Sequence, residues 1–178
     1  VREKIADHLN QKYNTGYGIN NIIMTNGVAG GINIVLRALL NPGDEVIIFR
    51  PYYPAYKGFV ENWQGKIVKV NPKEDFQPDF EDLEHKITIR TKVVIVNSPH
   101  NPTGVIYTKE TAAKISEILK SKQKEYGHAI CLLSDEPYRD LVYIEEELPW
   151  WPDFYQNTIV SYSFSKSLSL AGERIGYL

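Results

Sequence analysis

Short runs of β-branched and apolar residues alternate with longer helical patterns along almost the whole chain. Strands that alternate with helices are typical of a largely parallel sheet. We expect helices over residues 2–13, 29–40, 55–63, 80–86 and 109–126. We expect strands over residues 22–25, 45–49, 66–70, 92–96, 129–134, 158–162 and 174–178.

A mostly parallel sheet is covered by helices on both faces, so the chain is expected to fold as a three-layer α/β/α unit. Ligands bind such sheets outside the carboxyl ends of the strands. The sequence meets this requirement, because polar side chains follow three successive expected strands. These side chains are Asn97 and Asn101, then Asp135 and Tyr138, then Ser163 and Lys166.

The bulk composition argues against several classes of function. A formal net charge of −2 gives no basis for binding nucleic acid or an anionic membrane. The longest apolar runs, such as residues 93–96, are far too short to span a bilayer. Cys131 is the only cysteine, so we expect no disulfide and a reducing, cytoplasmic location. The histidines lack metal-ligand spacing, so no metal site is expected.

Gly27 precedes the helix that begins near Val28 and Ala29. The first N–H groups of a helix have no partner inside the helix, so they favour an anion, and glycine lets a phosphate come close. The signal is weak by itself. The segment matches neither the dinucleotide Gly-x-Gly-x-x-Gly pattern nor a P-loop.

Three motifs are more specific. Residues 163–176 read Ser-Phe-Ser-Lys-Ser-Leu-Ser-Leu-Ala-Gly-Glu-Arg-Ile-Gly, residues 97–104 read Asn-Ser-Pro-His-Asn-Pro-Thr-Gly, and residues 135–138 read Asp-Glu-Pro-Tyr. In this order they resemble the lysine motif, the Asn-Pro-Thr-Gly element and the Asp-x-x-Tyr element of the class I/II (fold type I) aminotransferases. Those enzymes use pyridoxal 5′-phosphate. The resemblance runs through essentially the whole chain and looks closest to aspartate-aminotransferase-like proteins.

The resemblance implies a role for each polar residue around the cofactor ring. Lys166 would form the aldimine with the cofactor's aldehyde and later move the proton between the substrate's α-carbon and the cofactor. Asp135 would lie beneath the pyridine nitrogen and keep it protonated, so that the ring accepts electrons. Asn101 and Tyr138 would hydrogen-bond the 3-hydroxyl oxygen. The plain structural alternatives are a solvated lysine, a cap after the strand, a turn asparagine and a packed tyrosine.

The same resemblance assigns the phosphate ligands. Ser163 and Arg174 match the family's phosphate-binding residues, and the guanidinium fork suits phosphate oxygens. Val28 and Ala29 would add backbone N–H groups. Family members often carry a polar side chain there, so this chain departs from the pattern and relies more on its main chain.

Tyr53 matches the aromatic residue that stacks on the pyridine ring in this family. Its neighbour Tyr52 is the alternative, and packing on the core is the structural alternative for both. Stacking contributes about 1 kcal/mol beyond the burial of area, so it positions the ring more than it drives binding.

We expect a single cofactor-binding large domain over residues 1–178, truncated at both ends, with a helix and loop over 1–20 and the α/β core over 21–178. In the family, a small domain that is absent here supplies the arginine for the substrate's α-carboxylate. A partner subunit supplies a tyrosine from a segment before residue 1. The resemblance therefore implies a longer, homodimeric protein that acts on an amino acid and a 2-oxo acid, and a fragment that is inactive alone.

Three alternative functions stay open at this point. A carbon–sulfur lyase on the same fold would retain every residue named above. An aminotransferase-like effector domain of a transcription regulator would keep the fold without the reaction. An inert truncated fragment would only fold or dimerise. The identity of the amino donor is also open.

Overall fold

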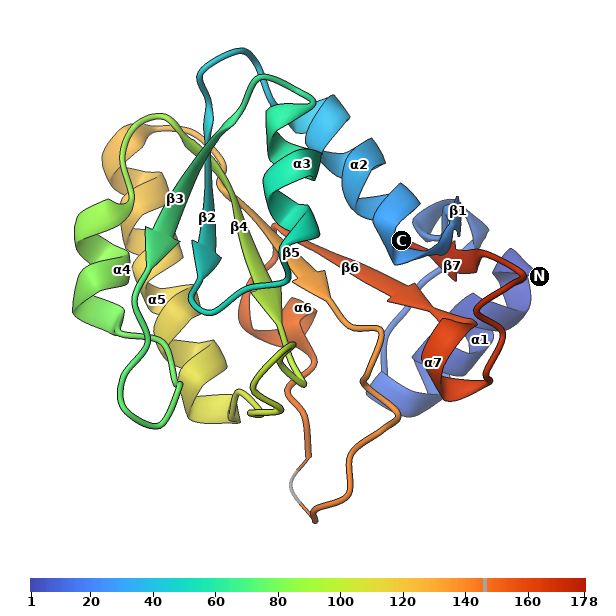
Figure 1. Cartoon of the computed structure of the whole chain (residues 1–178). Helices are drawn as coiled ribbons and strands as arrows, with labels where there is room; N and C mark the ends of the chain where they lie inside the picture. Colours follow the sequence, from blue (N-terminus) through green and yellow to red (C-terminus); the bar gives the residue numbers. More distant parts are fainter. Residues whose placement is uncertain (146) are drawn as a thin grey trace.

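One sheet is the frame of the molecule (Figure 1). The computed structural model describes residues 1–145 and 147–178, and within them seven strands pair in the order β1-β7-β6-β5-β4-β2-β3. Strands β3, β2, β4, β5 and β6 are parallel, whereas β7 is antiparallel to both β6 and β1. The strands are β1 (Met24–Asn26), β2 (Glu45–Phe49), β3 (Lys66–Val70), β4 (Thr91–Asn97), β5 (Cys131–Asp135), β6 (Thr158–Ser163) and β7 (Ile175–Tyr177).

Helices cover both faces of the sheet. They are α1 (Arg2–Tyr13), the 3-10 helix η1 (Ile19–Asn21), α2 (Gly27–Leu39), α3 (Ala55–Glu61), α4 (Phe80–Lys86), α5 (Lys109–Tyr126), α6 (Trp151–Phe154) and α7 (Phe164–Ser167). Side chains alternate between the two faces along each strand. Leu133 therefore packs with α2 and α3, and Leu132 packs with α4, α5 and α6 on the opposite face. The expected three-layer α/β/α arrangement is confirmed.

Local sequence explains where the longer helices begin and end. The Asp79 carboxylate accepts hydrogen bonds from the backbone N–H groups of Glu81 and Asp82 at the start of α4. The Thr108 hydroxyl accepts from the backbone of Thr111 at the start of α5. Such side chains satisfy N–H groups that have no partner inside the helix, and each contributes about 1 kcal/mol. Helix α5 ends at Gly127, whose φ of 70° suits glycine.

The antiparallel end of the sheet carries a third apolar cluster. Helix α1 packs there through Ile5 and Leu9 against Tyr162 and Tyr177. Deeper in this region, the buried Arg139 guanidinium donates to the Glu136 carboxylate and to the backbone carbonyl of Pro149. A buried ion pair holds a fold together only when its remaining hydrogen bonds are made, and here the Ser134 hydroxyl also donates to Glu136.

Several boundaries expected from the sequence are wrong. The short helices α6 and α7 were not expected, because four residues give too little periodicity to detect. Helix α2 begins at Gly27, two residues before the expected start at 29. The first strand occupies Met24–Asn26 rather than 22–25, and the fifth begins at Cys131 rather than at 129. The ends of the two strands depend on hydrogen bonds to strands distant in sequence, and the local sequence pattern does not record those bonds.

None of the helices in the described part of the chain combines the length and the apolar character that crossing a membrane requires.

The close packing of β7 against β6 and α2 predicts that Gly176 tolerates no side chain. A Cβ atom at this position would lie 2.6 Å from the carbonyl oxygen of Tyr162 and 3.0 Å from the carbonyl carbon of Gly27. Because these are backbone atoms, Gly176→Ala must move a strand or a helix, and we expect a loss of roughly 2–3 kcal/mol. Gly172→Ala is the matched control, because its Cβ would meet nothing within 4 Å. Equal denaturation midpoints for the two variants would contradict the prediction.

Candidate active site

A cavity of about 360 Å³ opens where the parallel strands end. It collects side chains and backbone from the start of α2, the loop before α3, the ends of β4, β5 and β6, and the segment after α7. Its walls include every site residue expected from the sequence: Val28, Ala29, Tyr53, Asn101, Asp135, Tyr138, Ser163, Lys166 and Arg174. Residues far apart in the chain thus meet around one space of the size that small-molecule sites have.

Strand register brings the central residues together. Asn97 pairs with Asp135 across β4 and β5, and Asp135 pairs with Ser161 across β5 and β6. Asp135 lies two residues after Leu133, so its side chain faces the same side of the sheet as α2 and α3. All three strands are parallel, so their last residues meet at one edge. The last polar residues of these strands, Asn97, Asp135 and Ser163, therefore all line the cavity.

The Asp135 carboxylate is the most perturbed polar group in the cavity. Its Oδ2 atom accepts a hydrogen bond from the buried hydroxyl of Tyr56, and its Oδ1 atom has no hydrogen-bond partner within the described residues. The pKa of Asp135 is raised to about 7, because burial, aided by the charge of Glu136, outweighs the lowering effect of the Tyr56 hydrogen bond. An unpartnered buried oxygen in a cavity is an acceptor that a ligand can satisfy.

The Asn97 side chain links the end of β5 to the loop that follows β4. This buried side chain donates from Nδ2 to the backbone carbonyl of Asp135 at 2.8 Å and accepts at Oδ1 from the backbone N–H of Asn101 at 2.7 Å. The side chain of Asn101 then lies 3.5 Å from the Tyr138 hydroxyl, with Nδ2 as donor. Burial raises the pKa of Tyr138, so its phenol stays protonated and can donate. Asn101 and Tyr138 thus present polar atoms side by side.

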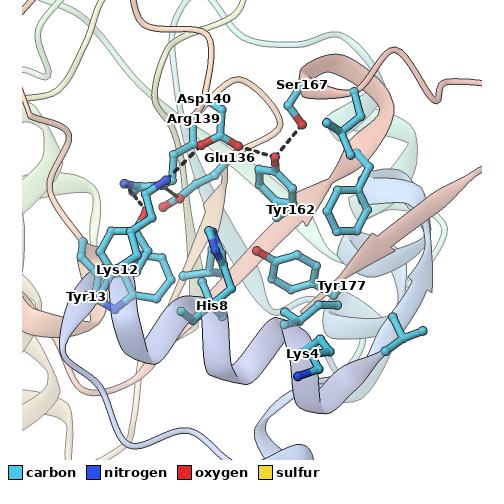
Figure 2. A pocket seen from close by; sticks show the side chains of 17 residues that line it. Lys4, His8, Lys12, Tyr13, Glu136, Arg139, Asp140, Tyr162, Ser167 and Tyr177 are labelled. Atoms are coloured by element: carbon cyan, nitrogen blue, oxygen red, sulfur yellow. Dashed lines mark hydrogen bonds and ion pairs between the residues drawn. The ribbon is translucent and has the colours of Figure 1, made fainter.

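Lys166 comes from α7, directly after β6. Its Nζ atom lies 5.9 Å from the centre of the Tyr138 ring. The next residue fixes this short helix, because the Ser167 hydroxyl lies 2.6 Å from the Tyr162 hydroxyl, which in turn donates to Asp140. Figure 2 shows this chain of contacts, which continues from Asp140 to Lys12 on α1. The hydrogen bonds of Ser167 and Tyr162 therefore hold the segment that carries Lys166 in place.

A corner rich in hydrogen-bond donors forms between Arg174 and the start of α2. Gly27 has a φ of 68°, and a Cβ atom there would lie only 2.8 Å from Nη2 of Arg174. The guanidinium thus lies beside the first turn of a 13-residue helix, whose N–H groups and dipole favour negative charge. The Ser163 hydroxyl lies in the same cavity. This corner has the donors that a phosphate group requires.

The two adjacent tyrosines differ in position. Tyr53 lines the cavity, with 41% of its surface exposed, and its ring meets Tyr56 edge-on at 5.7 Å. Tyr52 does not line this cavity in the described residues, and the Nζ atom of Lys69 lies over its ring at 5.3 Å. Of these two tyrosines, Tyr53 is therefore the one whose ring a ligand in the cavity can meet.

A larger cavity of about 680 Å³ lies between α1 and the β6–β7 end of the sheet (Figure 2). Its walls are mainly apolar. Several of its polar groups contact each other: Glu136 pairs with Arg139, and Asp140 accepts from Lys12 and Tyr162. Paired groups leave little capacity to bind a polar ligand. The smaller cavity, with its unpartnered carboxylate oxygen and its lysine, is the better candidate for chemistry.

Sequence reasoning missed Tyr56 and gave Asn97 no role of its own. Asn97 carried a usable signal, since it is a polar residue at the end of an apolar strand. Tyr56 carried none, because an aromatic residue in a short amphipathic helix reads as core packing. Its contact with Asp135 joins positions 79 residues apart.

Comparisons with known proteins find the following similarities. The chain matches the family described as Aminotransferase class I and II over residues 1–178. It is 39% identical to the aspartate aminotransferase of Sulfolobus acidocaldarius, covering 100% of this chain and 44% of that protein. The crystal structure of an amino transferase from Eubacterium rectale superposes with a TM-score of 0.97 at 46% identity, covering 99% of this chain and 45% of that one. The structure of an alanine aminotransferase from Pyrococcus furiosus superposes with a TM-score of 0.89 at 34% identity, covering 99% of this chain and 44% of that one.

The raised pKa of Asp135 predicts that the stability of the protein depends on pH. Its value of about 7 lies above the ordinary 3.8, so the folded state binds a proton more tightly than the unfolded state. The resulting stabilisation is complete below about pH 4 and is lost as the pH rises through 7. The side chain of Asp135→Asn stays neutral at every pH. The unfolding free energy of this variant, relative to that of the wild type, should therefore rise by at most about 1.4 kcal/mol per pH unit in this window.

Asp82 supplies the control of opposite sign for this titration. Burial tends to raise its pKa, but hydrogen bonds from the backbone of Asn71 and from Lys86 outweigh that effect, and the pKa is lowered. Asp82→Asn should therefore lose stability relative to the wild type as the pH rises from the acid range. Urea denaturation at a series of pH values measures both variants. A flat difference for Asp135→Asn would show that its carboxyl titrates normally.

Proposed function

Since the chain belongs to the class I and II aminotransferase family, we propose that it is the cofactor-binding large domain of a pyridoxal-phosphate-dependent aminotransferase. One observation carries the proposal: Lys166, the unpartnered oxygen of Asp135 and the Arg174 corner line one cavity. The chain spans about 45% of the length of the relatives it matches. Residues 1–178 form one such domain in this proposal, with a helix and loop over 1–20 and the core over 21–178.

The residues of the cavity fit pyridoxal phosphate. A protonated pyridine nitrogen is a donor, and Oδ1 of Asp135 is a buried acceptor without a partner among the described residues. A phosphate dianion needs several donors, and the guanidinium of Arg174 beside the first turn of α2 provides them. An aldehyde needs a primary amine, and Lys166 lines the same cavity.

Each residue would hold a different part of the cofactor. Arg174, the Ser163 hydroxyl and the backbone N–H groups of Val28 and Ala29 would hold the phosphate. Tyr53 would lie against the face of the ring. The remaining ligands would be Asn101 and Tyr138 at the 3-hydroxyl oxygen, Asp135 at the pyridine nitrogen and Lys166 at the aldehyde.

Bound pyridoxal phosphate supplies an electron sink for the pair released when the substrate's α-carbon loses a proton. Lys166 would take up and return that proton through its amine. Asp135 would hold the proton on the pyridine nitrogen, because a buried anion stabilises a positive charge next to it. Asn101 and Tyr138 would orient the ring by hydrogen bonds to its oxygen. The buried floor of the cavity would keep water from competing with these contacts.

The substrates proposed for the whole protein are an amino acid and a 2-oxo acid. The relatives are named for aspartate and for alanine, so their names do not fix the amino donor. We also propose a homodimer and a cytoplasmic location. The first extends the sequence resemblance to this family, and the second rests on the single cysteine.

Replacing Lys166 tests the lysine assignment. In full-length protein incubated with pyridoxal phosphate and reduced with borohydride, mass spectrometry should find the cofactor attached to the peptide that contains Lys166. In Lys166→Ala this adduct should be absent, and pyridoxamine phosphate formation from an amino acid should fall at least about 100-fold. Lys120→Ala, on the outer surface of α5, is the control. Unchanged labelling in Lys166→Ala would overturn the assignment, and release of pyruvate and sulfide by the wild type would favour a lyase.

Replacing Arg174 tests the phosphate corner. Arg174→Gln removes the charge but keeps hydrogen-bonding capacity. Because a charge-assisted hydrogen bond contributes 1.5–3 kcal/mol, the dissociation constant of pyridoxal phosphate should rise roughly 10- to 100-fold. The constant for pyridoxal, which lacks the phosphate, should change little. Arg90→Gln, on an exposed turn, should leave both constants unchanged. Equal losses for the two ligands would mean that Arg174 does not bind the phosphate.

A further inference from the structure

Tyr56 is a buried polar residue that the functions assigned above do not use. It lies on α3 with 3% of its surface exposed, and its hydroxyl donates to Oδ2 of Asp135. It does not line the cavity in the described residues. A buried phenol requires a hydrogen-bond partner. The partner could have been any backbone carbonyl of the sheet, but it is the carboxylate at the floor of the site.

This hydrogen bond gives the two carboxylate oxygens of Asp135 different surroundings. Oδ2 is held from behind by Tyr56, and Oδ1 is left without a partner in the described part of the chain. An aspartate carboxylate rotates in a broad, roughly two-fold torsional well. One hydrogen bond to a fixed donor selects one orientation within that well. The oxygen that remains is the one that a ligand in the cavity can reach.

The main chain of Asp135 is fixed by a different residue. Asn97 donates to its backbone carbonyl at 2.8 Å, and the β4–β5 and β5–β6 ladders hold both sides of the strand. Within the described residues, the structure gives the carboxylate itself the single hydrogen-bond partner Tyr56. The orientation of the carboxylate therefore depends on α3, whereas its place depends on the sheet.

Helix α3 supports the cavity at two points. Tyr53 precedes this helix and lines the cavity, and its ring meets the Tyr56 ring at an interplanar angle of 89°. Val60, on the next turn, is fully buried against the sheet and anchors the helix. One segment thus carries both the ring that lines the cavity and the donor behind the carboxylate.

We propose that Tyr56 is a positioning residue that turns the Asp135 carboxylate so that Oδ1 meets the nitrogen of the bound pyridine ring. This inference rests on the proposed function. Tyr56 touches neither cofactor nor substrate and acts through Asp135. The hydrogen bond also favours the ionised carboxylate, since it lowers the pKa of Asp135 against the effect of burial. Without the Tyr56 hydroxyl the ionised form of Asp135 is less favoured, so the carboxylate keeps the proton on the pyridine nitrogen less firmly.

The test uses full-length protein loaded with pyridoxal phosphate that carries ¹⁵N in the ring. In the wild type, the pyridine ¹⁵N resonance should lie in the protonated range. In Tyr56→Phe, it should move toward the unprotonated range, and kcat should fall roughly 10-fold while KM changes less than about twofold. Tyr56→Met, which also lacks a donor and packs adaptably, carries the same measurement if the first variant does not fold.

Tyr155→Phe is the matched control. Tyr155 is also buried, and its hydroxyl donates to the backbone of Ile130 at 2.7 Å, on the opposite face of the sheet. Its loss should destabilise the fold to a similar degree but leave the ¹⁵N resonance in place. An unmoved resonance in Tyr56→Phe, or an equal movement in Tyr155→Phe, would overturn the inference. A wild type that never attaches the cofactor at Lys166 would overturn the proposed function instead.

Discussion

The parallel register of β4, β5 and β6 is the constraint on which the site depends. Asn97 pairs with Asp135, so β4 and β5 end level, and β6 continues two residues beyond Ser161, the partner of Asp135, to Ser163. The residues that follow the three strands begin at the same edge of the sheet. A slip of one residue in β5 would turn Asp135 to the opposite face, toward α5, and away from α2 and α3. Such a slip is costly, because it would take the Asp135 carboxylate away from its partner Tyr56 and bury it against the apolar cluster on the opposite face. Pairing of the buried carboxylate therefore helps to fix the register of β5.

The same burial makes the site costly. Asp135 is buried beside an apolar layer with a single hydrogen-bond partner in the described residues, and burial displaces its pKa to about 7. An uncompensated buried carboxylate persists only where the surrounding structure holds it in place. A bound cation at Oδ1 would offset this cost. At this residue the proposed function and the stability of the protein without a ligand thus oppose each other.

Much of the fold and of the candidate site was predictable, and the reasons differ. The layers follow from the alternation of strands and helices, which is local information. Six of the nine candidate site residues lie in the three motifs, the other three come from the family resemblance alone, and all nine line one cavity. The antiparallel direction of β7 was not predictable, because a three-residue strand shows no preference for either direction. Tyr56 was not predictable either, because its role arises only when α3 folds over β5.

The corner between Arg174 and the start of α2, proposed to bind phosphate, shows how tertiary packing brings weak local signals together. Gly27 before a helix is a common feature and had little force by itself. In the structure, Gly176 brings β7 against the carbonyl carbon of Gly27, and this approach sets Arg174 beside the first turn of α2. Two glycines distant in sequence thus allow this close packing: a Cβ atom at Gly27 would meet the guanidinium, and one at Gly176 would meet the backbone of Gly27 and of Tyr162. The Gly-x-Arg-x-Gly spacing is thus a packing requirement as well as a motif, because its last glycine places the arginine that it follows.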